Sequence, residues 1–185
     1  GFFWTYVDVW YIGVIIAPFN LLNPLLDINQ SLDELKSNKA TLIIFMCNHC
    51  PYVIHVLDGL IDLANDYLPK GVSIIAINSN DIVNYPKDSP ENMIKLVNNY
   101  DIPFSYLFDE TQQIAKEYNA ACTPDFSVFN KDMECVYRGQ MDDSRPGNSI
   151  SVTGADIRLI LDGLLSGVEI KKTQKPSVGC NIKWK

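Results

Sequence analysis

Cys47-Asn48-His49-Cys50-Pro51 directly follows the apolar run Thr41-Leu42-Ile43-Ile44-Phe45-Met46, and these two stretches decide the fold. The apolar run predicts a strand that is buried on both faces. From Pro51 to Leu68 the apolar side chains recur at helical spacing, so Cys50 stands at the start of a helix. Unpaired backbone N–H groups at that end of a helix stabilise a thiolate and lower its pKa. The two cysteines are therefore placed for thiol chemistry.

Strand and helix patterns alternate on both sides of this motif. We predict strands over 41–46, 72–77 and 105–108, followed by a hairpin over 125–129 and 135–137. Helices are predicted over 51–68, 91–100, 111–118 and 153–165, with a short helical turn after Ser31. This order indicates an α/β fold with a central mixed sheet flanked by helices. In such a sheet the cysteine pair lies at the carboxyl end of a parallel strand, where catalytic groups collect.

Composition narrows the class of protein. The chain of 185 residues is 47% hydrophobic, which suits one globular domain. With 22 acidic and 15 basic residues the net charge is -7, and no basic cluster is present, so nucleic acid is not an expected partner. Five cysteines are too few for a disulfide scaffold of this length and fit redox chemistry or metal binding better.

The two ends of the chain are the least regular parts. Residues 1–17 are apolar and aromatic, but Asp8 interrupts them and no basic segment precedes them. We therefore expect a β extension over residues 1–11 rather than a signal peptide or a membrane span, and the absence of a visible signal favours a cytoplasmic location. The main domain is predicted over 12–185, including a tail without clear periodicity over 166–185.

Several segments together resemble known proteins. A Cys-x-x-Cys-Pro motif between a strand and a helix, with Thr123-Pro124 entering a later strand, resembles the thioredoxin fold. More narrowly, the chain from about residue 12 onward is similar to the redoxin (AhpC/TSA-type) family. The segments that carry this resemblance, besides 45–53, are Ala17-Pro18-Phe19, Ala76-Ile77-Asn78-Ser79-Asn80-Asp81, Cys122-Thr123-Pro124-Asp125-Phe126, residues 137–146 and Gly179-Cys180-Asn181-Ile182-Lys183-Trp184-Lys185.

The resemblance implies a thiol–disulfide oxidoreductase. Cys47 would attack a disulfide, and Cys50 would resolve the mixed disulfide. Pro124 would follow a cis bond and present the backbone of Thr123 to an extended substrate. The remaining residues expected to border the substrate are Asn48, Pro51 and Cys122. The Cys47–Cys50 disulfide would take the place of a cofactor, no metal is expected, and the partners would be protein or small-molecule disulfides and a redox partner, in an antioxidant or redox-homeostatic role.

His49 and the strand before the pair leave the mechanism open. A partly protonated imidazole next to Cys50 is expected to lower the pKa of Cys47 and favour the reduced state, unless His49 is only a solvated loop residue. The buried acid of thioredoxins would fall near Ile43 or Ile44, and neither can move a proton. The alternative proton acceptors at strand ends are Asp81, Asp109 and Asp125.

Two other functions compete with disulfide exchange. Peroxiredoxins use a single cysteine in a Pro-x-x-x-Thr-x-x-Cys setting with a nearby arginine, whereas Met46 precedes Cys47 here and only Arg138 and Arg145 remain as substitutes. A copper-binding module of this fold uses two cysteines three residues apart and a distant histidine. His49 and His55 are the only histidines in the chain, and we expect His55 to be a surface or packing residue.

The three other cysteines carry separate expectations. Cys122 either borders the substrate groove or packs as a small apolar residue. Cys135 lies in a strand pattern and is predicted to belong to the core. Cys180 lies in the aperiodic tail, where packing is the simpler interpretation and a third redox thiol the alternative if the tail folds back over the pair.

Overall fold

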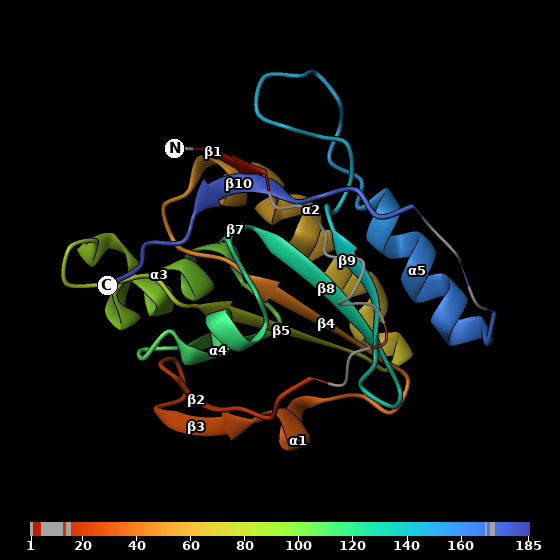
Figure 1. Cartoon of the computed structure of the whole chain (residues 1–185), viewed down its shortest axis with the longest axis horizontal. Coiled ribbons are helices and arrows are strands. Elements are labelled where there is room, and N and C mark those ends of the chain that lie inside the picture. The colour runs from red at the N-terminus through yellow and green to blue at the C-terminus, as the bar shows by residue number, and fades with distance from the viewer. Residues whose placement is uncertain (1, 5–12, 14–15, 169, 171–172) are drawn as a thin grey trace.

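A seven-stranded mixed sheet forms the centre of the protein in a computed structural model that describes residues 2–4, 13, 16–168, 170 and 173–185 (Figure 1). The strand order is β3-β2-β6-β5-β4-β8-β9. β4 pairs in parallel with β5 and antiparallel with β8, and β5 pairs in parallel with β6. These seven strands are β2 (Asn20–Asn23), β3 (Ile28–Ser31), β4 (Ala40–Phe45), β5 (Val72–Asn78), β6 (Ser105–Phe108), β8 (Asp125–Asn130) and β9 (Cys135–Gly139).

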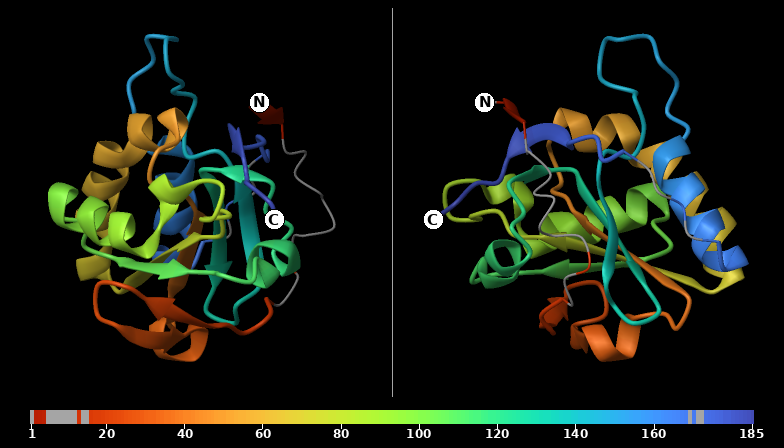
Figure 2. Two further views of the ribbon diagram at one scale, coloured as in Figure 1. Left: turned by 90° about the vertical axis from the view of Figure 1, so that its left-hand side faces the viewer. Right: turned by 45° about the vertical axis from the view of Figure 1, so that its right-hand side comes forward.

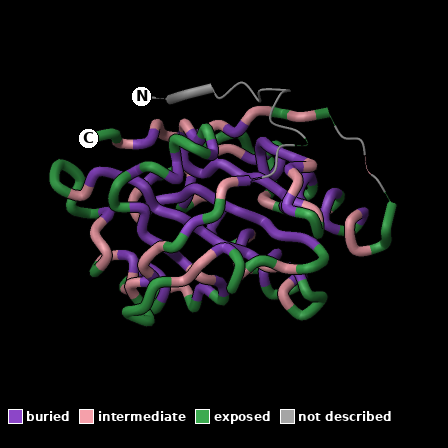
Figure 3. The backbone as a smooth tube through the Cα atoms, turned by 60° about the horizontal axis from the view of Figure 1, so that its bottom comes forward, coloured by how far each residue is buried: buried purple, intermediate pink, exposed green. Residues whose placement is uncertain are grey.

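β4 is buried along its whole length because helices cover both faces of the sheet. Its side chains alternate between two cores, as the pleat of a strand requires. Leu42 and Ile44 pack into the core beneath α2, whereas Ile43 and Phe45 pack into the opposite core. Figure 3 shows buried residues running through the middle of the molecule. The predicted α/β fold with a central mixed sheet is confirmed.

Three longer helices lie over one face and two short helices over the other. The first core contains residues of α2 (Pro51–Tyr67), α3 (Pro90–Tyr100) and α5 (Ala155–Ser166). The second core contains residues of α1 (Leu32–Leu35) and α4 (Gln113–Glu117). The described residues also form two 3-10 helices, η2 (Leu68–Lys70) and η3 (Pro86–Asp88). Within the described residues no helix has both the length and the apolar character that crossing a bilayer demands.

A second, small sheet contains one strand from near each end of the described chain and one from its middle (Figures 1 and 2). Its order is β1 (Phe2–Trp4), β10 (Val178–Asn181) and β7 (Cys122–Thr123), and both pairings are antiparallel. The expectation of an aperiodic tail is therefore corrected for residues 178–181. The reason is that four residues are too few to establish a period of two, and backbone pairing with β7 fixes their conformation instead.

The predicted N-terminal β extension agrees with β1 at residues 2–4, whereas residues 5–12 lie outside the described part of the chain. The sequence did not predict the β2–β3 hairpin, in which Asn20 pairs with Ser31 and Asn23 with Ile28. Its residues are mostly half-buried or exposed, so they carry little hydrophobic pattern.

Candidate active site

The cysteine pair lies where β4 ends and α2 begins. Cys47 follows β4 by two residues, and Cys50 is the N-cap of α2 with extended backbone angles of φ -68° and ψ 127°. Pro51 fits the first helical position because its missing N–H would have no partner there. Both thiols are free and only 1% exposed. The pair is thus covered in this conformation.

Thr123, at the end of β7, faces both cysteines. The Thr123–Pro124 peptide bond is cis. The hydroxyl oxygen of Thr123 lies 3.6 Å from the Cys47 sulfur, and the carbonyl oxygen of Thr123 lies 3.4 Å from the Cys50 sulfur. Residues that are more than seventy positions apart in the sequence therefore form one site.

A buried carboxylate, that of Asp88 at the end of η3, supports the loop between the two cysteines. It accepts hydrogen bonds from the backbone N–H of Asn48 at 2.8 Å and from the side-chain amide of Asn80 at 2.8 Å. Its Oδ1 also lies 2.9 Å from Nδ1 of His49. The side chain of Asn48 accepts a hydrogen bond from the Tyr106 hydroxyl at 2.9 Å. The Cys47–Cys50 loop is therefore held rigidly on its inner side.

Hydrogen bonding shifts the pKa values of the two thiols in opposite directions. The pKa of Cys50 is lowered from 9.0 to about 5, first by the hydrogen bond with Cys47 and against the effect of burial. The thiol of Cys180 and backbone N–H groups lower it further. The pKa of Cys47 is raised, first by the hydrogen bond with Cys50, then by burial and by the charge of Asp88. In the reduced pair the negative charge therefore resides on Cys50.

This arrangement differs from the expectation for His49. The imidazole was expected to lower the pKa of Cys47, but it pairs with Asp88, and the charge of that carboxylate raises the Cys47 pKa. The histidine side chain remains 33% exposed, whereas Asp88 is fully buried. The carboxylate thus dominates the electrostatics on this side of the pair.

The three acidic residues considered from the sequence have other contacts. Asp81 accepts hydrogen bonds in its own turn from Val83 N–H at 3.0 Å and from Asn84. Asp109 accepts the N–H of Ala115 at the start of α4. Asp125 pairs with Arg138 at 3.0 Å. Asp88 was missed because it stands in a polar loop far from any predicted strand end, and the only signal was its position directly before the Ser89-Pro90 helix start.

The three remaining cysteines differ in burial and in their distance from the Cys47–Cys50 pair. Cys122 and Cys135 are buried and donate to backbone carbonyl groups, those of Pro124 at 3.8 Å and Tyr137 at 3.5 Å. Cys180 is half-buried, and its sulfur lies 2.8 Å from the Cys50 sulfur. The pKa of Cys180 is raised to about 12, first by burial and then by the hydrogen bond with Cys50. The tail thus places a third thiol at the pair.

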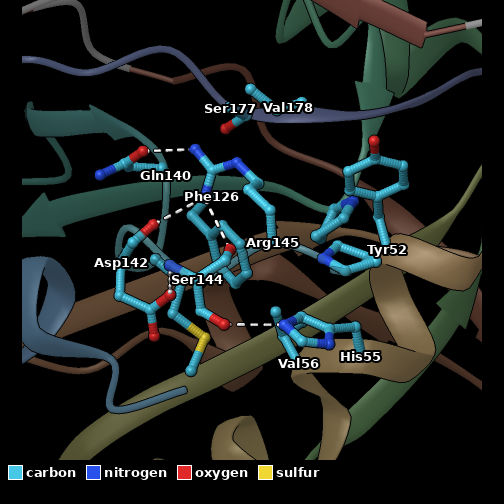
Figure 4. Close-up of a pocket in the computed structure, with 13 residues that line it drawn as sticks. Tyr52, His55, Val56, Phe126, Gln140, Asp142, Ser144, Arg145, Ser177 and Val178 are labelled. Atoms are coloured by element: carbon cyan, nitrogen blue, oxygen red, sulfur yellow. Dashed lines mark hydrogen bonds between the residues drawn. The ribbon is translucent and has the colours of Figure 1, made fainter. Parts of the chain in front are cut away.

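A small cavity, shown in Figure 4, has Pro124 among its lining residues. It encloses about 20 Å³, which is room for about one water molecule. His55 lies in its wall, with Nε2 2.7 Å from the hydroxyl of Ser144. Arg145 also lines it and donates to the carbonyl groups of Asp142 and Ser144, both at 2.8 Å. The cavity is too small to admit a substrate side chain in this conformation.

The two arginines considered for peroxide chemistry are therefore engaged elsewhere. Arg138 is 3% exposed in its ion pair with Asp125, and Arg145 bonds to backbone carbonyl groups beside the cavity. One group in the described part of the chain has donors spaced for a metal ion. Ligand atoms of Cys47, His49 and Asp88 lie within 4.8 Å of one another, although the Asp88 oxygen already accepts two hydrogen bonds.

Two solved structures resemble the whole chain. An uncharacterized conserved protein from Geobacillus kaustophilus is 54% identical with a TM-score of 0.97, over 100% of this chain and 97% of that chain. A hypothetical protein from Sinorhizobium meliloti is 40% identical with a TM-score of 0.93, over 98% of this chain and 97% of that chain. No curated protein matches the chain.

A more distant structure shares the fold. A secreted disulfide oxidoreductase from Mycobacterium tuberculosis has a TM-score of 0.58 at 17% identity, over 81% of this chain and 96% of that chain. The family model described as Redoxin matches residues 18–157. The chain therefore belongs to the Redoxin family, with a thioredoxin-like fold and a thiol-based redox function.

Proposed function

We propose that this protein is a thiol–disulfide oxidoreductase that exchanges disulfides through Cys47 and Cys50. The observation that carries the proposal is the meeting of the two thiols with Thr123, the residue before the cis bond. A dithiol at the start of a helix, opposite a backbone carbonyl group, can receive a substrate disulfide and close on itself. Its substrates are protein or small-molecule disulfides, and a separate redox partner regenerates the pair.

The first step forms a mixed disulfide. Cys47 attacks one sulfur of the substrate disulfide, a new S–S bond forms at Cys47, and the other substrate sulfur leaves as a thiolate. The Cys50 thiolate accepts the proton of Cys47 as the substrate disulfide is attacked, because it is the ionised member of the pair and adjoins the Cys47 thiol. This assigns the role of first proton acceptor to Cys50 itself.

The second step releases the product. Cys50 attacks the Cys47 sulfur, the Cys47–Cys50 disulfide forms, and the second substrate sulfur leaves. The proton that Cys50 took from Cys47 passes to the first substrate thiolate, and the second substrate thiolate takes a proton from water, so two electrons pass to the substrate. The hydrogen bonds from Cys180 and from backbone N–H groups favour the Cys50 thiolate after Cys47 has been consumed.

Replacement of the attacking thiol tests the proposal. In Cys47→Ser, the rate of reduction of a protein disulfide should fall at least about a hundredfold, because the nucleophile is lost. Cys135→Ser is the matched control, since this thiol is buried in the second core, whereas the pair lies in the first, and the change should leave the rate unchanged. Unchanged exchange in Cys47→Ser would contradict the proposal. Peroxide consumption measured beside it tests the peroxidase alternative, which would be favoured if peroxide turnover exceeded disulfide exchange.

A further inference from the structure

Cys180 reaches the pair because β10 lies on the strand that carries Thr123. In the antiparallel pairing of β10 with β7, Cys180 is opposite Thr123 and Asn181 is opposite Cys122. Figures 1 and 2 show β10 between β1 and β7, crossing the molecule beside the start of α2. The same backbone segment that faces Cys47 and Cys50 therefore also positions the third cysteine.

Close backbone packing fixes this position. A Cβ atom on Gly179 would lie 1.9 Å from the Thr123 carbonyl oxygen, a distance that no side chain can accept. Glycine at this position is thus required for β10 to lie so near the residue before Pro124. The close approach of β10 to Thr123 therefore depends on Gly179.

Hydrogen bonds on both sides of Cys180 hold the strand in place. Before it, the hydroxyl of Ser177 donates to the Asp125 carboxylate at 2.9 Å. After it, the N–H of Ile182 donates to the carbonyl of Ala121 at 3.1 Å, and the N–H of Lys183 donates to the Asn80 side chain at 2.9 Å. The side chain of Ile182 is 1% exposed in the second core. Cys180 is therefore held against Cys50 rather than carried by a loose tail.

The sulfur atoms of Cys50 and Cys180 are 2.8 Å apart. A disulfide bond is about 2.05 Å long, so bond formation needs a movement of less than about 1 Å. Unlike Cys47 and Cys50, Cys180 is half-buried, which leaves it the most accessible member of the cluster. Cys50 is the central sulfur, with hydrogen bonds to both other thiols.

We propose that Cys180 is a third redox thiol that forms a disulfide with Cys50. This inference rests on the proposed dithiol exchange. The Cys180 thiolate attacks the Cys50 sulfur of the Cys47–Cys50 disulfide, the Cys50–Cys180 bond forms, and the Cys47–Cys50 bond breaks. Cys47 leaves as a thiolate and takes up the proton that Cys180 lost. The step exchanges one disulfide for another and needs no external oxidant.

The consequence is that oxidised enzyme has two forms. One holds the disulfide inside the pair, and the other holds it between Cys50 and the tail with Cys47 free again. In the second form Cys47 is a free thiol that can attack a substrate, while the protein still holds one disulfide, between Cys50 and Cys180. A substrate or redox partner can then exchange with the half-buried outer sulfur of Cys180 while α2 and β4 stay in place.

Removal of Cys47 isolates the proposed disulfide. Cys47→Ser retains four of the five cysteines. After oxidation with diamide, a thiol oxidant, two of these four thiols should disappear from titration. Tryptic digestion should then link the peptide of residues 40–70 to that of residues 173–183. The control Cys47→Ser/Cys180→Ser should keep all three remaining thiols. Four free thiols and no linked peptide in Cys47→Ser would overturn the inference.

A second variant tests the placement by β10. Gly179→Ala should push β10 away from Thr123 and slow Cys50–Cys180 bond formation in the Cys47→Ser background by about tenfold or more. Val178→Ala is the matched control on the same strand, and it should form the bond at the parent rate. Equal rates for the two variants would contradict placement by this contact.

Disulfide exchange by the intact pair is measured separately in Cys180→Ser. If exchange persists there while the linked peptide never forms in Cys47→Ser, only the third-thiol inference fails. If Cys47→Ser/Cys180→Ser, which lacks both partners of Cys50, retains exchange at the parent rate, the proposed dithiol function fails, whatever disulfide is mapped.

Discussion

Asp88 shows how one buried residue sets both the shape and the charge of the site. Its carboxylate holds the backbone of Asn48 and the ring of His49, and it raises the pKa of Cys47. A buried charge with three hydrogen-bond donors is tolerated because its lone pairs are satisfied. The same charge opposes ionisation of the attacking thiol, so Asp88 tunes the pair toward the Cys50 thiolate.

Removal of this charge should make Cys47 more acidic. In Asp88→Asn the pKa of Cys47 should fall, because the repulsion between carboxylate and thiolate is lost. The pH dependence of alkylation at Cys47, followed by peptide mass spectrometry, measures the change. Asp81→Asn is the control, since that carboxylate caps its own turn through Val83 and Asn84. A Cys47 pKa that is equal in the two variants would contradict this role of Asp88.

The sequence predicted the residues of the pair but not their surroundings. Cys47, Cys50, Thr123 and Pro124 could be found because a motif and its strand–helix context mark them. Asp88 could not, and Cys180 could be named only as an alternative, since each reaches the site through long-range packing, of η3 in one case and of β10 in the other. Local patterns carry no information on such contacts.

At the scale of elements, α2 is the helix on which the site depends. Leu57 is fully buried in the core between α2 and the sheet, whereas Ile54, on the same helix, is 39% exposed. This contrast follows the amphipathic spacing that predicted the helix. The N-cap Cys50 keeps its position only while the buried face of α2 stays packed.

Replacing Leu57 or Ile54 by alanine should show how much of the stability contributed by α2 comes from its buried face and how much from the helix itself. Leu57→Ala should lower the free energy of unfolding by about 2–5 kcal/mol, because it removes buried methyl groups and leaves a cavity. Ile54→Ala should change it by less than about 1 kcal/mol. Urea unfolding of both reduced variants measures the difference. Similar losses in the two variants would show that α2 does not pack as described.

Strong hydrophobic patterns predicted the main elements, and weak patterns did not. β4 and β5 are continuous apolar runs, and the helices α2, α3 and α5 carry clear apolar faces. The hairpin of β2 and β3 and the strand β10 are short and largely half-buried or exposed. Their conformation is set by backbone pairing with other strands, which composition and periodicity do not record.

At the scale of the whole molecule, the shifted acidity of Cys50 couples the redox state to stability. Its pKa in the folded, reduced protein is about 5, against 9.0 for an unshifted thiol. Between these values the folded state holds Cys50 as a thiolate while the unfolded state keeps its proton. Stability from this group is therefore fully present above pH 9 and is lost as the pH falls toward 5.

The reduced protein should thus become more stable between about pH 6 and about pH 8, by at most about 1.4 kcal/mol per pH unit. Asp81 and Asp143 have pKa values lowered from 3.8, so their contribution to the pH dependence of stability falls below this pH range. Urea unfolding in the presence of a reductant measures the slope. Cys50→Ser should reduce that slope, and a slope identical to that of the parent would contradict the assignment of the thiolate to Cys50.

The small sheet has a further consequence for the order of assembly. β10 lies C-terminal to every other element and pairs with β1, near the other end of the chain. A ribosome therefore makes β4, α2 and β7 before β10. The order of synthesis places Cys47 and Cys50 in the growing chain before Cys180, so the third thiol can join the pair only after these other elements of the site have been made.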